Sequence, residues 1–69
     1  MFFKKKKTYC IEWSFEINSP YRYSTFIKAK DIHDAAERFV KVVGSYPRYV
    51  HRITSLDGEE WINPNEREL

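Results

Sequence analysis

The stretch TYCIEWSFEI, residues 8–17, alternates polar and apolar side chains from end to end. A period of two is typical of a β-strand that has one face against a core and the other in water. The apolar face would carry Tyr9, Ile11, Trp13, Phe15 and Ile17, and the polar face Thr8, Cys10, Glu12, Ser14 and Glu16. The pattern therefore predicts a half-buried strand over residues 8–17.

A second strand is predicted after a short run of turn-forming residues. Asn18-Ser19-Pro20-Tyr21 is such a run, because Pro20 presets the backbone for a turn. Residues 22–30 then resume an extended pattern, in which one face consists of Tyr23, Thr25, Ile27 and Ala29. Together the two strands predict an antiparallel hairpin.

A helix of about three turns is predicted between Asp31 and Gly44. Asp31 is a suitable N-cap and Gly44 a suitable C-cap. The apolar residues at helical spacing are Ile32, Ala36, Phe39, Val40 and Val43, and the opposite side carries Asp34, Glu37, Arg38 and Lys41. The first set would face a core and the second would face water, with Glu37 and Lys41 in a favourable i,i+4 order.

Two more strands are predicted in the last third of the chain. Residues 48–56 are strand-like, but their apolar positions do not alternate cleanly, so a bulge or burial on two sides is expected. Asp57-Gly58 is a hairpin signal of the type I′ kind, and residues 59–62 would form the short return strand.

The order β-β-α-β-β predicts an α+β domain, in which one helix packs on one face of a small antiparallel sheet. The other face stays in water, as antiparallel sheets allow. We expect this open face to carry Cys10, Glu12, Ser14, Arg22, Ser24, Phe26 and Lys28.

The length of 69 residues suits a single domain, over residues 8–63, with a basic N-terminal tail at 1–7 and an acidic C-terminal tail at 64–69. No apolar run approaches the roughly 20 residues that span a bilayer, and the mean hydropathy is −0.67. Cys10 is the only cysteine, so an intramolecular disulfide is excluded. We expect a soluble, cytoplasmic protein with no membrane partner.

Charge is uneven along the chain although the net charge is only +2. Residues 1–7 carry four lysines and no acid, whereas residues 57–69 carry five acids and one arginine. Either the two ends are solvated segments that attract each other, or a basic patch for an anionic partner lies beside an acidic one. We favour the first interpretation.

Motifs for catalysis and for cofactor or metal binding are missing from the sequence. Cys10, His33 and His51 lie far apart and lack the close pairing of a zinc site. Glu12 and Glu16 would share an open strand face, without the burial that separates two carboxylates into an acid and a base. The sequence therefore predicts a protein that is not an enzyme and has no cofactor.

Nucleic-acid binding is one hypothesis, because aromatic and basic residues are interleaved in two predicted strands. Rings stack on unpaired bases while Arg and Lys contact phosphates. The residues proposed for this role are Lys4, Lys5, Lys6, Lys7, Arg48 and Arg52. The plainer interpretation, which we favour, is that the aromatics complete a small core and the charges keep it soluble.

Protein binding is the second hypothesis and explains the same surplus of rings. Tyr, Trp and Arg are enriched at the centres of protein interfaces. The proposed contacts are Arg22, Phe26, Lys28, Tyr46, Arg48, Tyr49, Arg52, Glu59 and Trp61. We expect a monomer or a weak homodimer, since an unpaired edge strand invites a second copy.

In size and order of elements the chain resembles small phage proteins that inhibit bacterial defences, including anti-CRISPR proteins. The resemblance covers the second half of the chain: residues 34–39, residues 49–53, the Asp57-Gly58 hairpin and Trp61. It implies a non-enzymatic inhibitor in the host cytoplasm that occludes a nuclease, a CRISPR effector or another nucleic-acid-processing protein. It assigns no functional residue. The small net charge places this expectation ahead of direct nucleic-acid binding.

Overall fold

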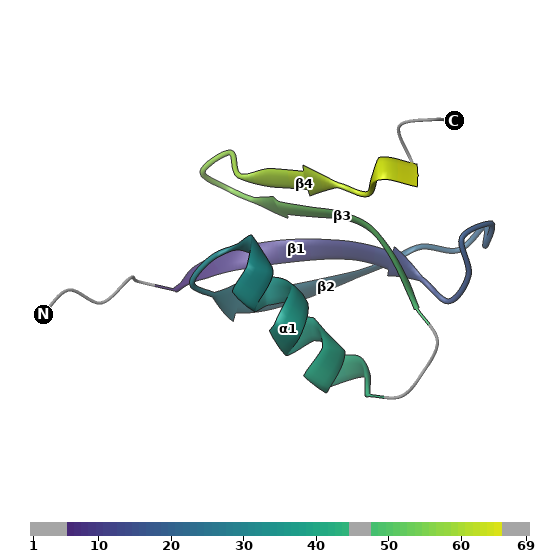
Figure 1. The fold of residues 1–69 in the computed structure, drawn as a ribbon, viewed down its shortest axis with the longest axis horizontal. Coiled ribbons are helices and arrows are strands. Elements are labelled where there is room, and N and C mark those ends of the chain that lie inside the picture. Colours follow the sequence, from purple (N-terminus) through teal and green to yellow (C-terminus); the bar gives the residue numbers. More distant parts are fainter. Residues whose placement is uncertain (1–5, 45–47, 66–69) are drawn as a thin grey trace, which may run out of the picture.

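Within the residues that the computed structural model describes, 6–44 and 48–65, four strands form one antiparallel sheet and one helix lies against it (Figure 1). The elements are β1 (Lys7–Ser14), β2 (Tyr23–Ala29), α1 (Ile32–Val43), β3 (Tyr49–Ser55) and β4 (Glu60–Ile62). The order in the sheet is β2-β1-β3-β4, which places β1 and β3 at its centre. The predicted fold class, an α+β domain with one helix on a small antiparallel sheet, is confirmed.

Both predicted ends of the helix are confirmed. The Asp31 carboxylate accepts a hydrogen bond from the backbone N–H of Asp34 at 2.8 Å, which satisfies a free donor of the first turn. At the other end the N–H of Gly44 donates to the carbonyl of Val40 at 3.0 Å. Gly44 has φ of 68°, in the left-handed region that favours glycine, so the helix ends there.

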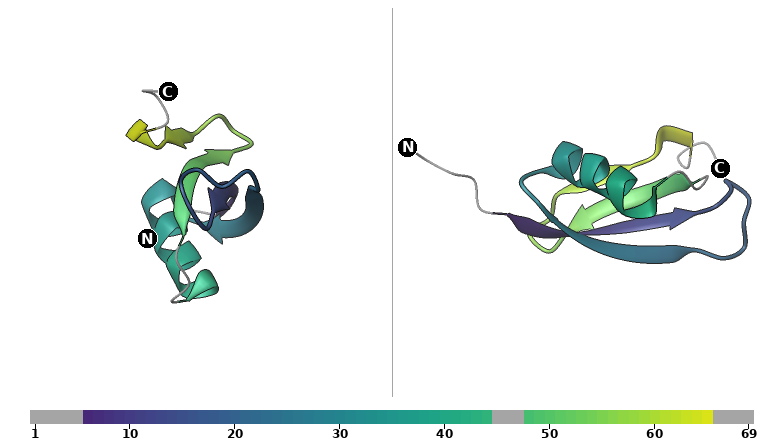
Figure 2. Two further views of the ribbon diagram at one scale, coloured as in Figure 1. Left: turned by 90° about the vertical axis from the view of Figure 1, so that its right-hand side faces the viewer. Right: turned by 90° about the horizontal axis from the view of Figure 1, so that it is seen from below.

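The core lies between α1 and the half of the sheet formed by β1 and β2. Figure 2 shows α1 as a separate layer on one side of the sheet, and its contacts are mainly with β2 and then with β1. Ala35 and Phe39 are the buried residues of the helix. The buried apolar strand residues are Tyr9, Ile11, Ile27, Ala29 and Ile53.

The first strand ends at Ser14 and not at Ile17 as predicted. The chain turns away there, and the turn is closed by a hydrogen bond from the Ser19 N–H to the Glu16 carbonyl at 3.2 Å. Phe15 and Ile17 are consequently exposed, so their predicted places on the core face are wrong. Phe15 instead packs edge-on against Trp13 and Tyr23, with ring centroids 5.3 and 5.5 Å away.

A β-bulge in β3 changes which side chains share a face of the sheet. Glu12 pairs with Arg52, but the next residue, Trp13, pairs with Val50, so His51 is an extra residue in β3. The bulge that the irregular pattern predicted is therefore confirmed. Ser14 lies beyond it, is fully buried and is hydrogen-bonded to His51, so its predicted exposure on the open face is wrong.

Candidate protein-binding groove

An apolar groove lies between α1 and the half of the sheet formed by β3 and β4. α1 sits over β1 and β2, and the twisted sheet brings β4 up on the side that carries the helix (Figure 2). The groove has a volume of about 520 Å³. Its lining consists of Ile32, His33, Ala36, Phe39 and Val40 from α1, and of Arg48, Val50, Ile53 and Trp61 from the sheet side.

The helix wall of the groove includes a row of three apolar side chains. Ile32, Ala36 and Val40 are spaced by four residues, so they form a ridge along one side of α1. Ala36, at the middle of this ridge, is its smallest member. Val40 is 48% exposed, although the periodicity predicted that it would face the core. That prediction is wrong because α1 lies to one side of the sheet and leaves this flank uncovered.

The sheet wall depends on the bulge. Ile53 and Trp61 are directly opposite each other on β3 and β4, and both line the groove. Without the extra residue at His51, the alternation would turn Val50 away from Ile53. With it, Val50 joins the same wall. Trp61 is 37% exposed, so a large indole surface remains accessible at the edge of the groove.

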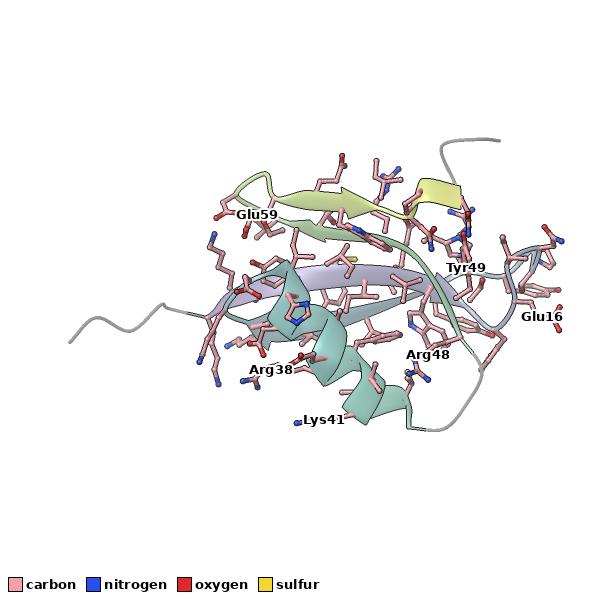
Figure 3. The ribbon with its side chains drawn as sticks, in the orientation of Figure 1. Glu16, Arg38, Lys41, Arg48, Tyr49 and Glu59 are labelled. Carbon is pink, nitrogen blue, oxygen red and sulfur yellow. The ribbon has the colours of Figure 1, made fainter. Side chains whose placement is uncertain are left out.

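The two polar residues among the described lining of the groove lie toward opposite ends of α1. His33 is in the first turn and pairs with Glu37, with 3.1 Å between Nε2 and Oε1. Arg48 lies beside the last turn, where its Nη1 donates to the carbonyl of Gly44 at 3.2 Å (Figure 3). A guanidinium at this position complements the negative end of the helix dipole. Among its described residues the groove is therefore apolar except for a histidine toward one end of α1 and an arginine toward the other.

The predicted partner-binding residues divide between two faces of the protein. Arg48 and Trp61 belong to the groove. Phe26, Lys28 and Arg52 are exposed on the open face of the sheet, where Arg52 Nε lies 3.9 Å from Glu12 Oε2. Arg22 is exposed in the segment between β1 and β2, and Tyr46 falls outside the described residues. The structure thus does not bring the predicted set together.

Tyr49, another predicted contact, belongs to a buried cluster at the end of the open face (Figure 3). Its ring packs against the ring of His51, with centroids 4.7 Å apart. Ser14 Oγ donates to the carbonyl of Glu16 at 2.5 Å and lies 2.8 Å from His51 Nε2. Because the serine has only one hydrogen to donate, Nε2 must donate to Oγ. This Ser–His pair therefore lacks the arrangement of a nucleophile activated by a base.

The acidic hairpin is occupied by contacts within the protein. Lys7 forms ion pairs with Asp57 and Glu59, and the Tyr9 hydroxyl donates to Glu59 Oε2 at 2.6 Å. The hydrogen bond from Lys7 lowers the pKa of Asp57 to about 2, and the one from Tyr9 lowers the pKa of Glu59. Burial and the hydrogen bond to Glu59 raise the pKa of Tyr9 to about 12.

The ion pairs of Lys7 bear on the two interpretations of the oppositely charged ends of the chain. Lys7 attracts the acidic hairpin, as the interpretation of mutual attraction predicted. Lys7 and Glu59 therefore already have partners of opposite charge. Lys6 is exposed, and Lys4 and Lys5 fall outside the described residues.

No protein-family model, curated protein or solved structure matches the chain. Over the described ranges 6–44 and 48–65, no three His, Cys, Asp or Glu side chains gather in a way that could hold a metal ion. In the same ranges α1 is too short and too polar to span a membrane.

The groove was missed by sequence reasoning for a physical reason. The helix residues Ile32, Ala36 and Val40 were all expected to face the core, because they are apolar and spaced for burial. Apolar spacing shows that a side chain avoids water, but it does not show whether the protein itself or a partner covers it. The irregular spacing of apolar residues in 48–56 was the only signal, and it predicted the bulge.

Proposed function

We propose that this protein is a non-enzymatic binding module that occupies the surface of another protein through the groove between α1 and β3–β4. The observation that carries the proposal is the exposure of Val40 and Trp61 on opposite walls of one apolar groove. Exposed apolar side chains that gather in one groove, and are not scattered singly, are a feature of interaction sites. The groove also contains a tryptophan and an arginine, which are residue types enriched at the energetic centres of interfaces.

The partner that we propose is a nucleic-acid-processing protein, such as a nuclease or a CRISPR effector, which the module inhibits by steric occlusion. Support comes from the size and order of elements shared with small anti-defence proteins. The arrangement of the groove fits such a role, because occlusion requires a binding surface and no reacting groups.

Site-specific crosslinking in the cells that express the protein tests the proposal. The photoreactive residue p-benzoylphenylalanine would replace Trp61 in one variant and Val42 in another. Val42 is also exposed, at 65%, but lies among the charged residues on the other flank of α1. We expect a discrete, protease-sensitive adduct from position 61 and none from position 42. Equal adducts from both positions, or none from position 61, would exclude the groove as the binding site.

The alternative function, binding of single-stranded RNA or DNA, is supported by one observation on the opposite face. Phe26 is 70% exposed, and Lys28 and Arg52 share its side of the sheet. An exposed ring beside cations suits base stacking. The same crosslinker at position 26 distinguishes the two functions, because an adduct that a nuclease removes would identify nucleic acid as the partner. Anisotropy of labelled single strands at low and physiological salt would then measure the affinity.

A further inference from the structure

We infer that Glu59 is a positioning residue for the groove: its contacts with Tyr9 and Lys7 of β1 hold β4, and with it Trp61, in place as the outer wall. We call these contacts of Glu59 the clamp. Its importance for binding rests on the proposed function, whereas the clamp itself can be tested without a partner. Three observations support it: the shortness of β4, the row in which Glu59 lies and the partners of its carboxylate.

The wall that carries Trp61 is a short strand at the edge of the sheet. β4 contains three residues, Glu60–Ile62, and its main contacts are with β3. Edge segments with few contacts open locally at a much lower free energy than the core strands do. A side-chain contact of modest strength can therefore change how often this wall is in place.

Glu59 lies one row away from Trp61 on the side of the sheet that carries α1. Tyr9 is opposite Ser55 in the register of β1 and β3, and the Ser55 N–H donates to the Glu59 carbonyl at 3.0 Å. The next row on the same side consists of Ile11, Ile53 and Trp61. Residues two apart along a strand share a face of the sheet. Glu59 therefore links the Trp61 side of the hairpin to β1.

The carboxylate of Glu59 reaches across β3 to the central strand β1. Its Oε2 accepts a hydrogen bond from the Tyr9 hydroxyl at 2.6 Å and lies 2.9 Å from Lys7 Nζ. Tyr9 is fully buried, so packing fixes the position of its ring. A hydrogen bond to an ionised group is stronger than one between neutral groups. The same two contacts lower the pKa of Glu59, and removing its charge would weaken both.

The other end of β4 is fixed separately. The side-chain amide of Asn63 donates to the Val50 carbonyl at 2.9 Å, and the Asn63 N–H donates to the His51 carbonyl at 3.0 Å. Trp61 lies between this end and Glu59 along the chain. Loss of the clamp therefore frees one end of β4 and leaves the other end attached.

Amide hydrogen exchange in the full-length protein tests the role of Glu59. Glu59→Gln and Glu60→Gln remove the same charge from neighbouring positions, but Glu60 is exposed and alternation turns it to the open face. Tyr9→Phe removes the other member of the hydrogen bond and keeps the buried ring. Nitrogen-15 NMR spectra of each variant and of the unchanged protein give the exchange rates and the indole signals of Trp13 and Trp61.

The expected effect is local to one end of β4. Glu59→Gln raises the exchange rate of the Ser55 amide by about fivefold or more, the change that follows from the loss of one net hydrogen bond. Glu60→Gln changes this rate by less than about twofold, and neither variant changes the rates in β1 and β2 by more than that. In Glu59→Gln the indole signal of Trp61 shifts more than that of Trp13. Tyr9→Phe has the same effects, and the double variant shows less than their product, because both substitutions break one bond.

Other results would overturn the role of Glu59 and can be told apart from a failure of the proposed function. Equal rates at the Ser55 amide in Glu59→Gln and Glu60→Gln would show that the clamp does not hold β4. A rise in β1 and β2 as large as at Ser55 would show that Glu59 stabilises the whole fold. If the clamp behaves as expected but position 61 gives no crosslink, the proposed function fails and the clamp remains. An unchanged crosslink yield from position 61 in Glu59→Gln would reject the importance of the clamp for binding and keep the proposed function.

Discussion

The two halves of the sheet differ in how they are covered on the side that carries α1. Over β1 and β2 the helix buries Phe39 to 1% exposure, whereas the next residue along the chain, Val40, faces the β3–β4 half and is 48% exposed. One step along the helix therefore separates a core position from an exposed groove position. The comparison teaches that the single helix stabilises one half of the sheet and leaves an apolar groove beside the other half.

The largest effect on stability is expected from truncating Phe39, the core residue of the half of the sheet that α1 covers. Phe39→Ala should lower the free energy of unfolding by about 3–5 kcal/mol, because it leaves a cavity between α1 and β1–β2. This is a large share of the stability of so small a domain. Urea titration in a stabilising osmolyte, which preserves a folded baseline, measures the loss. A loss below about 1 kcal/mol would mean that the covered half is not the core.

A smaller loss is expected from the buried cluster on the open face. Ser14→Ala removes two hydrogen bonds of a buried hydroxyl, the one to the Glu16 carbonyl and the one with His51 Nε2, which together should cost about 1–3 kcal/mol. The matched control is Ser24→Ala, because Ser24 is an exposed serine of β2, and it should change stability by less than about 0.5 kcal/mol. Urea titration measures both variants. Equal losses from the two would show that the Ser14–His51 bond does not stabilise the fold.

Acid should weaken the contact between the β1–β2 half of the sheet and the β3–β4 half, since Lys7 of β1 forms ion pairs with the hairpin that precedes β4. The pKa of Asp57 is about 2 in the folded protein, against an ordinary value of 3.8, and that of Glu59 is also lowered. These depressed pKa values contribute stability above the ordinary values, and the contribution is lost as the pH falls toward 2.

The measurement is the unfolding free energy between pH 6 and pH 2 for the unchanged protein and for Asp57→Asn. The variant should show the shallower loss with falling pH, because it removes a carboxylate whose pKa is lowered to about 2. Parallel pH profiles for the two proteins would contradict the coupling of Lys7 to the hairpin. High salt should reduce the difference, since these side chains are partly exposed.

The smallest stability effects are expected on the two exposed flanks of the helix. Val40→Ser and Val42→Ser should each change the free energy of unfolding by no more than about 0.5 kcal/mol, as for other surface substitutions. If Val40→Ser alone lowered the free energy of unfolding by more than about 1 kcal/mol, the groove would belong to the core. The difference between the two halves of the sheet would then be contradicted. Thermal unfolding followed by circular dichroism is sufficient to measure both variants.

Local patterns were enough to predict the elements and several details within them. Asp31 and Gly44 delimited the helix, because capping depends on groups within one turn. The alternation of residues 8–14 predicted β1, but Phe15 and Ile17 continued the same pattern beyond its end. Alternation records polarity only, and the turn after Ser14 depends on hydrogen bonds that the pattern does not contain.

Long-range pairing decided the candidate site. The irregular positions in β3 predicted a bulge, but only the pairing with β1 assigned it to His51 and so turned Val50 toward Trp61. The charge of the two ends allowed mutual attraction or a basic patch, and the contacts of Lys7 with Asp57 and Glu59 support the first. Neither outcome follows from spacing, since both join residues far apart in the chain.

The sequence by itself determined the order of the elements, the ends of α1 and the single-layered sheet with one helix, because these depend on periodicity and on caps. Only the tertiary structure decided that α1 covers β1 and β2 and leaves a groove beside β3 and β4. The periodicity of a helix shows which of its sides is apolar, but its position across a sheet depends on how the side chains of both layers pack.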